Sequence, residues 1–111
     1  MPDIPENRSD RDELTLAQQR AETLTSQRQM AEMFVKGAQM DFSKCRDALF
    51  NTETMALLPR DKCFRKRLRD MRLAEAYLKQ AMLALKTAQD SEQSAWRAYQ
   101  ELVMETQATV A

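Results

Sequence analysis

Residues 73–102, LAEAYLKQAMLALKTAQDSEQSAWRAYQEL, decide the fold of this chain. Alanine recurs there every seven residues, at positions 74, 81, 88 and 95, and other apolar residues follow at alternating steps of three and four. That spacing places these side chains on one side of an α-helix. Small side chains repeated in one heptad position let a second helix approach closely, so the stretch predicts one helix of a left-handed coiled coil.

The same alternation occurs earlier in the chain, so each predicted helix has an apolar seam along one side. The seam of the first helix consists of Leu14, Ala17, Ala21, Leu24, Arg28, Ala31, Val35, Ala38, Phe42, Cys45 and Leu49. The seam of the second helix consists of Met71, Ala74, Leu78, Ala81, Leu85, Ala88, Glu92, Ala95, Tyr99 and Leu102. Because the connection is short, the two helices should be antiparallel. We therefore predict an all-α fold, an antiparallel two-helix hairpin of the coiled-coil type.

The predicted organisation is a disordered N-terminal arm at residues 1–9, followed by a single helical-hairpin domain at residues 10–108. This domain divides into a first helix, a connection and a second helix, at 10–50, 51–59 and 60–106. Ser9 can cap the first helix with its hydroxyl group. Pro59 disfavours a helical conformation of the residue before it and suits the start of the next helix.

Charged residues interrupt both seams, and their positions predict the register. Folding the chain about residue 56 places Glu92 opposite Arg20. Arg28 also lies on the seam, but it would reach Glu92 only if the register slid by about two helical turns. A charged layer of this kind lowers stability and can fix the register of a coiled coil.

A second set of large apolar side chains lies outside the seams, where two helices alone cannot cover it. The predicted protein-interface residues are Leu16, Met30, Met33, Phe34, Met40, Phe64, Leu68, Met82, Trp96 and Val103. A contiguous exposed apolar patch usually marks an interface, and flexible methionine side chains suit variable partners. We therefore expect another protein as partner, with homodimerisation of the hairpin into a four-helix bundle as the first candidate.

Residues 60–72 carry a net charge of +5 in a chain whose total is zero. The basic residues of this block are Arg60, Lys62, Arg65, Lys66, Arg67, Arg69 and Arg72. One interpretation is a patch for an anionic partner such as nucleic acid. The other is a solvated surface balanced by Asp41, Asp47 and Glu53, since surface charge has little effect on stability.

Nothing in the composition predicts catalysis. The chain has no histidine, which removes the commonest general base and the commonest metal ligand. Cys45 and Cys63 are 18 residues apart and lack the companion ligands of a zinc site. Neighbouring cations could lower the pKa of the Cys63 thiol, whereas Cys45 lies on the seam as a small apolar residue. We expect no enzyme activity, no cofactor and no metal.

The sequence thus predicts a non-catalytic protein–protein interaction module, an adaptor or chaperone-like protein that binds an amphipathic helix. In shape and composition it resembles small helical proteins that escort bacterial secretion substrates, which makes such a substrate or component one candidate partner. Two alternatives are a nucleic-acid-binding regulatory hairpin that uses residues 60–72, and a structural coiled-coil subunit of a larger assembly. The absence of a long apolar run predicts no membrane span, and the polar N-terminus predicts a cytoplasmic protein.

Overall fold

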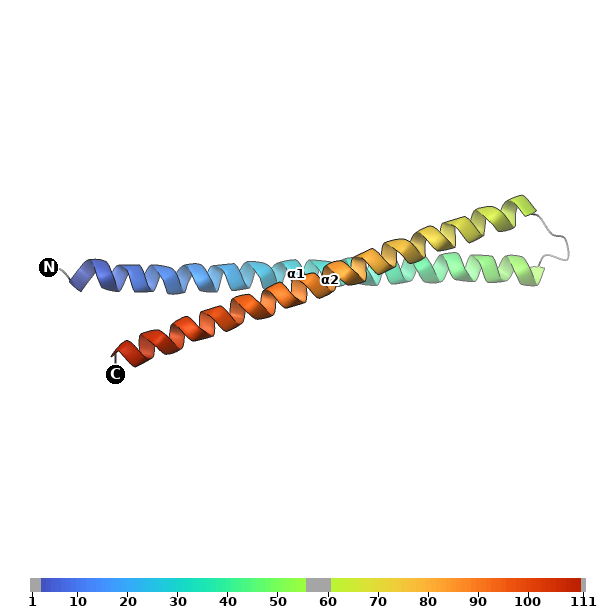
Figure 1. Cartoon of the computed structure of the whole chain (residues 1–111). Helices are drawn as coiled ribbons and strands as arrows, with labels where there is room; N and C mark the ends of the chain where they lie inside the picture. The colour runs from blue at the N-terminus through green and yellow to red at the C-terminus, as the bar shows by residue number, and fades with distance from the viewer. Residues whose placement is uncertain (1–2, 56–60, 111) are drawn as a thin grey trace. The chain divides into compact units, whose positions relative to one another are not determined.

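The computed structural model describes the backbone of residues 3–55 and 61–110 and the side chains of residues 11–51 and 64–108. Two helices account for this backbone: α1 (Asp3–Met55) and α2 (Asp61–Val110) (Figure 1). These described ranges contain no strand, so the all-α prediction is confirmed.

Both helices are longer than the sequence pattern predicts. Residues 3–9, expected as a disordered arm, belong to α1, which continues past residue 50 to Met55. Asn and Thr are only moderately unfavourable in helices, and the chain has no Gly or Pro between Gly37 and Pro59 that would end α1 earlier. Pro59 and the rest of the predicted connection from residue 56 onward lie outside the described residues.

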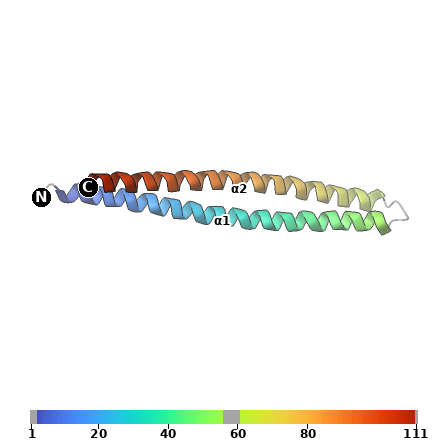
Figure 2. The same ribbon diagram turned by 90° about the horizontal axis from the view of Figure 1, so that it is seen from below.

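The chain divides into two compact units. Unit 1 consists of Met1–Gln29 and Lys86–Ala111, and unit 2 consists of Met30–Leu85. In each unit a segment of α1 lies beside a segment of α2, as two views at right angles show (Figures 1 and 2). The segments run in opposite directions within each unit, in agreement with the predicted antiparallel hairpin.

The predicted seams form the packed interior of both units. Every seam residue of α1 and of α2 is buried or half-buried, which confirms the heptad assignment. Burial is deepest at small side chains, with Ala21 0% and Ala38 2% exposed. No large side chain among the described residues is fully buried. The interior is therefore a single layer in which only small residues and Val35 are buried, a thin core for a chain of 111 residues.

The predicted register of unit 1 is wrong. Glu92 accepts hydrogen bonds from Arg28 rather than lying opposite Arg20, so the pairing is shifted by about two turns from the predicted one. Part of this shift follows from the longer α1, which moves the fold point beyond residue 56. The seam alone could not distinguish these registers, because its heptad repeat fits again after every two turns.

Candidate protein-binding site

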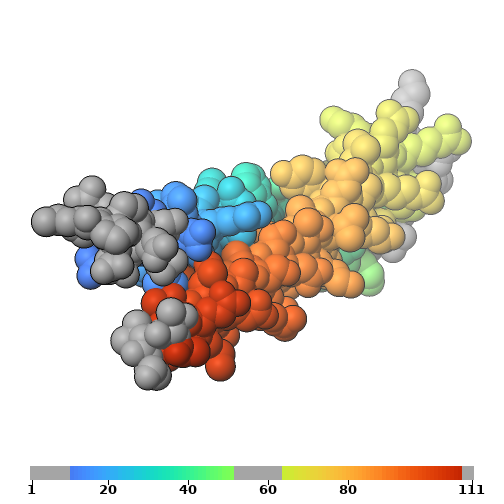
Figure 3. Space-filling model, turned by 60° about the vertical axis from the view of Figure 1, so that its left-hand side comes forward, coloured from blue at the N-terminus to red at the C-terminus, as the bar shows by residue number. Residues whose placement is uncertain are grey.

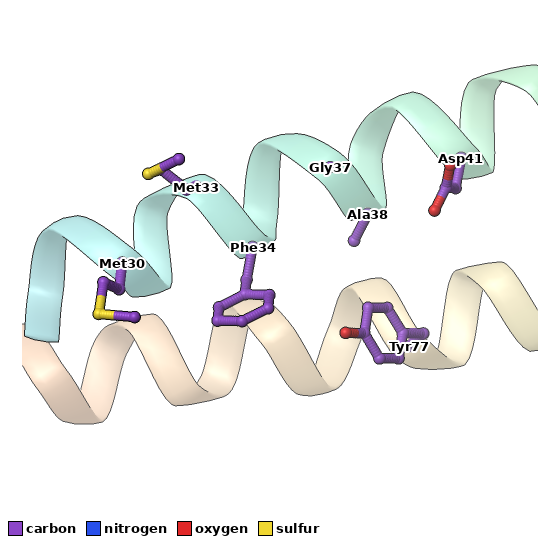
Figure 4. Close-up of a pocket in the computed structure, with 7 residues that line it drawn as sticks. All are labelled: Met30, Met33, Phe34, Gly37, Ala38, Asp41 and Tyr77. Atoms are coloured by element: carbon purple, nitrogen blue, oxygen red, sulfur yellow. The ribbon is translucent and has the colours of Figure 1, made fainter.

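Unit 2 contains an open apolar groove of about 390 Å³, here called the Phe34 groove. Its lining consists of Met30, Met33, Phe34, Gly37, Ala38 and Asp41 from α1 and Tyr77 from α2. Met30 and Phe34 extend from α1 on the side of α2, while Met33 points away from α2 (Figure 4). The lining is therefore mostly apolar, with the Asp41 carboxylate at one end of the α1 segment.

The position of the groove follows from helical spacing. Met30, Phe34 and Gly37 are four and three residues apart, so they lie on one side of α1. Phe34 is 59% exposed and Tyr77 is 54% exposed, which is unusual for two aromatic residues of one surface. Gly37 adds no side chain to the lining, and a Cβ atom built there would meet nothing within 4 Å.

The predicted interface residues divide into two groups. Six of them are exposed: Leu16, Met30, Met33, Phe34, Met40 and Met82. Four are half-buried rather than left in water by the two helices: Phe64, Leu68, Trp96 and Val103. Large exposed apolar side chains also occur outside the predicted set, at Phe50, Leu73, Tyr77, Leu83 and Met104. The exposed apolar surface therefore includes more of α2 than the sequence pattern predicts.

Trp96 is half-buried because its ring takes part in the packing of unit 1. Its indole Nε1 donates a hydrogen bond to the Thr25 hydroxyl at 2.9 Å. The Thr25 hydroxyl in turn donates to the Ala21 carbonyl at 3.0 Å. The ring also packs edge-to-face against Tyr99, with 5.8 Å between the centroids. The hydrogen bond to Thr25 joins α2 to α1 in unit 1, whereas the contact with Tyr99 lies within α2.

The charged layer of unit 1 is a half-buried ion pair. The Nε of Arg28 lies 2.9 Å from both carboxylate oxygens of Glu92, and the side chains are 24% and 16% exposed. Hydrogen bonding by the Arg28 guanidinium holds the pKa of Glu92 below its usual value of 4.5, and the Thr25 hydroxyl acts in the same direction. This pair lies on the seam and joins α1 to α2 within unit 1.

Unit 1 has its own groove, here called the Ser94 groove, with a volume of about 680 Å³. Its lining consists of Leu16, Ala17, Arg20, Leu24, Asp90, Ser91, Ser94, Ala95, Ala98 and Leu102. Side chains of the blue α1 segment and the orange-to-red α2 segment form a shared surface in the space-filling view (Figure 3). Small residues on α2, namely Ser91, Ser94 and Ala98, leave this groove wide.

The basic block serves partly as structure. Arg67 donates a hydrogen bond of 2.8 Å to the carbonyl of Ala48, near the end of α1. Arg65, Lys66, Arg69 and Arg72 are exposed, and no ion pair of theirs occurs within the part of the chain that the structure describes. The side chains of Arg60 and Lys62 lie outside the described residues.

Three of the exposed arginines share one side of α2. Arg65, Arg69 and Arg72 line a groove of about 370 Å³ together with Leu68 and Leu73. Their spacing of four and three residues produces this alignment. The guanidinium groups therefore form a basic stripe whose cationic side chains are accessible to an anionic partner.

The structure describes the side chain of one of the two cysteines. Cys45 is a free, half-buried thiol on the seam of α1. The side chain of Cys63 lies outside the described residues. Among the described side chains, no group of three or more His, Cys, Asp or Glu residues is placed to hold a metal ion. Over the described residues, neither helix has the length and apolar character needed to cross a membrane.

The sequence pattern missed two important parts of the Phe34 groove, Gly37 and Tyr77. Gly37 continues the spacing of Met30 and Phe34. A glycine inside a helix lowers stability by about 1 kcal/mol, so a glycine at this position could have indicated a place where a side chain is disfavoured. Tyr77 lies four residues after Leu73, and both are exposed on α2. This spacing could have been read as a second apolar stripe beside the alanine seam.

Comparison with known proteins adds no further information about the site. No protein-family model, curated protein or solved structure matches the chain.

Proposed function

We propose that this chain is a non-catalytic protein–protein interaction module, of the adaptor or chaperone-like type, whose Phe34 groove takes up an amphipathic helix of a partner. The observation that carries this proposal is the exposure of Met30, Phe34 and Tyr77 around an open apolar groove. Apolar side chains at steps of three and four are what a helix-in-groove interface requires.

The thin core supports the need for a partner. Large apolar side chains are the main source of burial in a stable domain, yet none in the described part of the chain is fully buried. A partner helix laid along the Phe34 groove would remove the rings of Phe34 and Tyr77 from water. Burying a large apolar side chain contributes about 1.5–3 kcal/mol, so a few such residues offset part of the loss of translational freedom on binding.

The methionines suit a partner-binding groove. Met30 and Met33 line the groove with flexible, polarisable side chains, which can repack against helices of different sequence. Gly37 adds no side chain to the groove lining, which leaves space for a side chain of the partner. Flexible side chains of this kind are typical of an escort or adaptor that binds several related helices. They are less typical of a protein with one fixed partner.

A fluorescein-labelled amphipathic peptide tests the proposal. We suggest a 20-residue helix with leucine at heptad positions a and d and no net charge, titrated at nanomolar peptide concentration. Fluorescence anisotropy should give a Kd of about 1–100 μM, as expected for a small apolar groove. Phe34→Glu should weaken binding at least about tenfold, because a charge would be placed in the apolar contact.

Met104→Glu is the matched control, because Met104 is an exposed methionine on α2 that does not line the Phe34 groove. It should bind the peptide as the parent chain does. Equal loss of affinity in both variants, or no binding of the peptide by the single-copy form of the parent chain, would contradict the proposed function. Circular dichroism should show that both variants keep the helix content of the parent chain.

The basic stripe supports a second candidate function, a hairpin that binds nucleic acid through Arg65, Arg69 and Arg72. Phosphate contacts release counterions, so affinity for a duplex should fall steeply as the salt concentration rises. Filter binding with a labelled 20-base-pair duplex at about 50 mM salt tests this candidate, with Arg65→Glu, Arg69→Glu and Arg72→Glu combined as the loss variant. No retention of the duplex at that salt concentration rules the candidate out.

A further inference from the structure

The surface of the chain is large enough to supply an extensive interface. The chain exposes 9215 Å² at a mass of 12.9 kDa. A compact monomer of that mass would expose about 6,300 Å² according to the usual scaling of surface with mass. The difference exceeds the roughly 800 Å² that each partner contributes to a standard interface.

The two units carry opposite net charges. Unit 1 contains 6 Lys and Arg against 10 Asp and Glu, a net charge of −4. Unit 2 contains 11 Lys and Arg against 7 Asp and Glu, a net charge of +4. The totals of 17 basic and 17 acidic residues match those of the whole chain, so the overall neutrality hides a strong separation of charge.

The two grooves differ in the size of the side chains along them. The Phe34 groove of unit 2 has large exposed side chains, Met30, Phe34 and Tyr77. The Ser94 groove of unit 1 has the larger volume, and its lining combines Leu16, Leu24 and Leu102 with small residues of α2 such as Ser94 and Ala98. Large side chains of one surface can therefore enter the space left by small side chains of the other, as close packing requires.

We infer that the Phe34 groove is occupied by the Ser94 groove region of a second copy of this chain, in an antiparallel homodimer. Each of its two equivalent contacts joins unit 1 of one copy to unit 2 of the other. This inference rests on the proposed function, because it names the helix that the Phe34 groove takes up.

Charge selects the antiparallel arrangement over the parallel one. A parallel dimer would place two units of −4 together and two units of +4 together, whereas the antiparallel dimer pairs −4 with +4 at both contacts. Complementary potentials favour the correct orientation, and like charges brought together disfavour the wrong one. Salt should therefore weaken the antiparallel dimer, whereas it would strengthen a parallel one.

Photo-crosslinking between isotopically distinct copies tests the arrangement. Met40→Cys is a suitable attachment point in the full chain, with Cys45→Ser and Cys63→Ser as background, because Met40 is 61% exposed on α1 near Gly37 but does not line the Phe34 groove. A benzophenone maleimide attached there should join ¹⁴N chains to ¹⁵N chains within residues 16–24 or 90–102, which contain the lining of the Ser94 groove. Mixed-isotope products joined to residues 30–85 instead would contradict the antiparallel dimer.

Sedimentation equilibrium provides the second readout. The expected result is a monomer–dimer equilibrium whose dissociation constant increases about tenfold or more between 0.05 and 0.5 M NaCl. A single-copy species at 100 μM, or growth beyond the dimer, overturns the inference.

The inference and the proposed function can fail separately. A chain that binds the amphipathic peptide through Phe34 but remains a single copy overturns the dimer alone. A chain that neither binds the peptide nor associates overturns both. For this comparison the peptide titration is run below the measured dissociation constant of the dimer, so that the groove is free.

Discussion

At the residue scale, Glu92 shows how one charged side chain on an apolar seam can be accommodated. Arg28 hydrogen-bonds both of its carboxylate oxygens, and neither side chain is more than a quarter exposed. An ionised carboxylate left without this partner would be costly at a half-buried position. The pair therefore favours the one register in which Arg28 and Glu92 meet.

The lowered pKa of Glu92 predicts how stability depends on pH. Its folded-state pKa lies below the usual 4.5, so its stabilising contribution is complete above that value and is lost as the pH falls through the folded-state pKa. The free energy of unfolding should exceed that of Glu92→Gln by a constant amount from pH 7 to about 5, and this excess should decrease toward about pH 3. Urea titrations of both proteins measure it, and an excess that persists unchanged at pH 3 would contradict the role of the pair.

Trp96 provides a second test at this scale. Trp96→Phe keeps an aromatic ring but removes the donor to Thr25, so it should lower the free energy of unfolding by about 1 kcal/mol. The double variant Thr25→Val, Trp96→Phe should lose less free energy of unfolding than the two single variants lose together, because both changes remove the same hydrogen bond. Additive losses in a double-mutant cycle would show that this hydrogen bond does not contribute.

At the scale of the helices, the alanines of the seam set how closely α1 and α2 approach. Ala38 is 2% exposed, so Ala38→Leu would force extra methylene groups between the helices of unit 2. Overpacking of this kind should lower the free energy of unfolding by about 1–3 kcal/mol. Thermal melts followed by circular dichroism measure the loss.

Ala84→Leu is the matched control for that change, because Ala84 lies on the exposed side of α2 in the same unit. Leucine is nearly as good a helix former as alanine, so this variant should melt within a degree or two of the parent chain. Equal melting temperatures for Ala38→Leu and the parent chain would mean that the seam does not hold the helices closely.

The sequence predicted the helices and their seams well but the register and the site only in part. Periodicity alone places Ala21, Ala38 and Ala95 on the buried side, since helical geometry fixes which residues share a side. Register depends on where each helix ends and which side chains meet, and a heptad repeat does not specify these. For the same reason the pattern identified Met30 and Phe34 but could not pair them with Tyr77 across the chain.

At the scale of the whole molecule, charge separation and exposed apolar surface predict the same association. Reversing the charge of the basic stripe with Arg65→Glu, Arg69→Glu and Arg72→Glu changes unit 2 from +4 to −2. Both contacts of the antiparallel dimer would then join units of like charge, so the dissociation constant should rise by at least about tenfold at low salt. Unchanged sedimentation equilibrium of this variant would contradict the electrostatic part of the dimer.

The role of the Phe34 groove in binding is tested most directly by the methyl resonances of the methionines. In a chain with ¹³C-methyl methionine, addition of the amphipathic peptide should shift the signals of Met30 and Met33, which line the groove. The signal of Met104, which is exposed elsewhere on α2, should stay in place. Shifts at Met104 with none at Met30 and Met33, or no shifts at saturating peptide, would contradict a helix-binding groove.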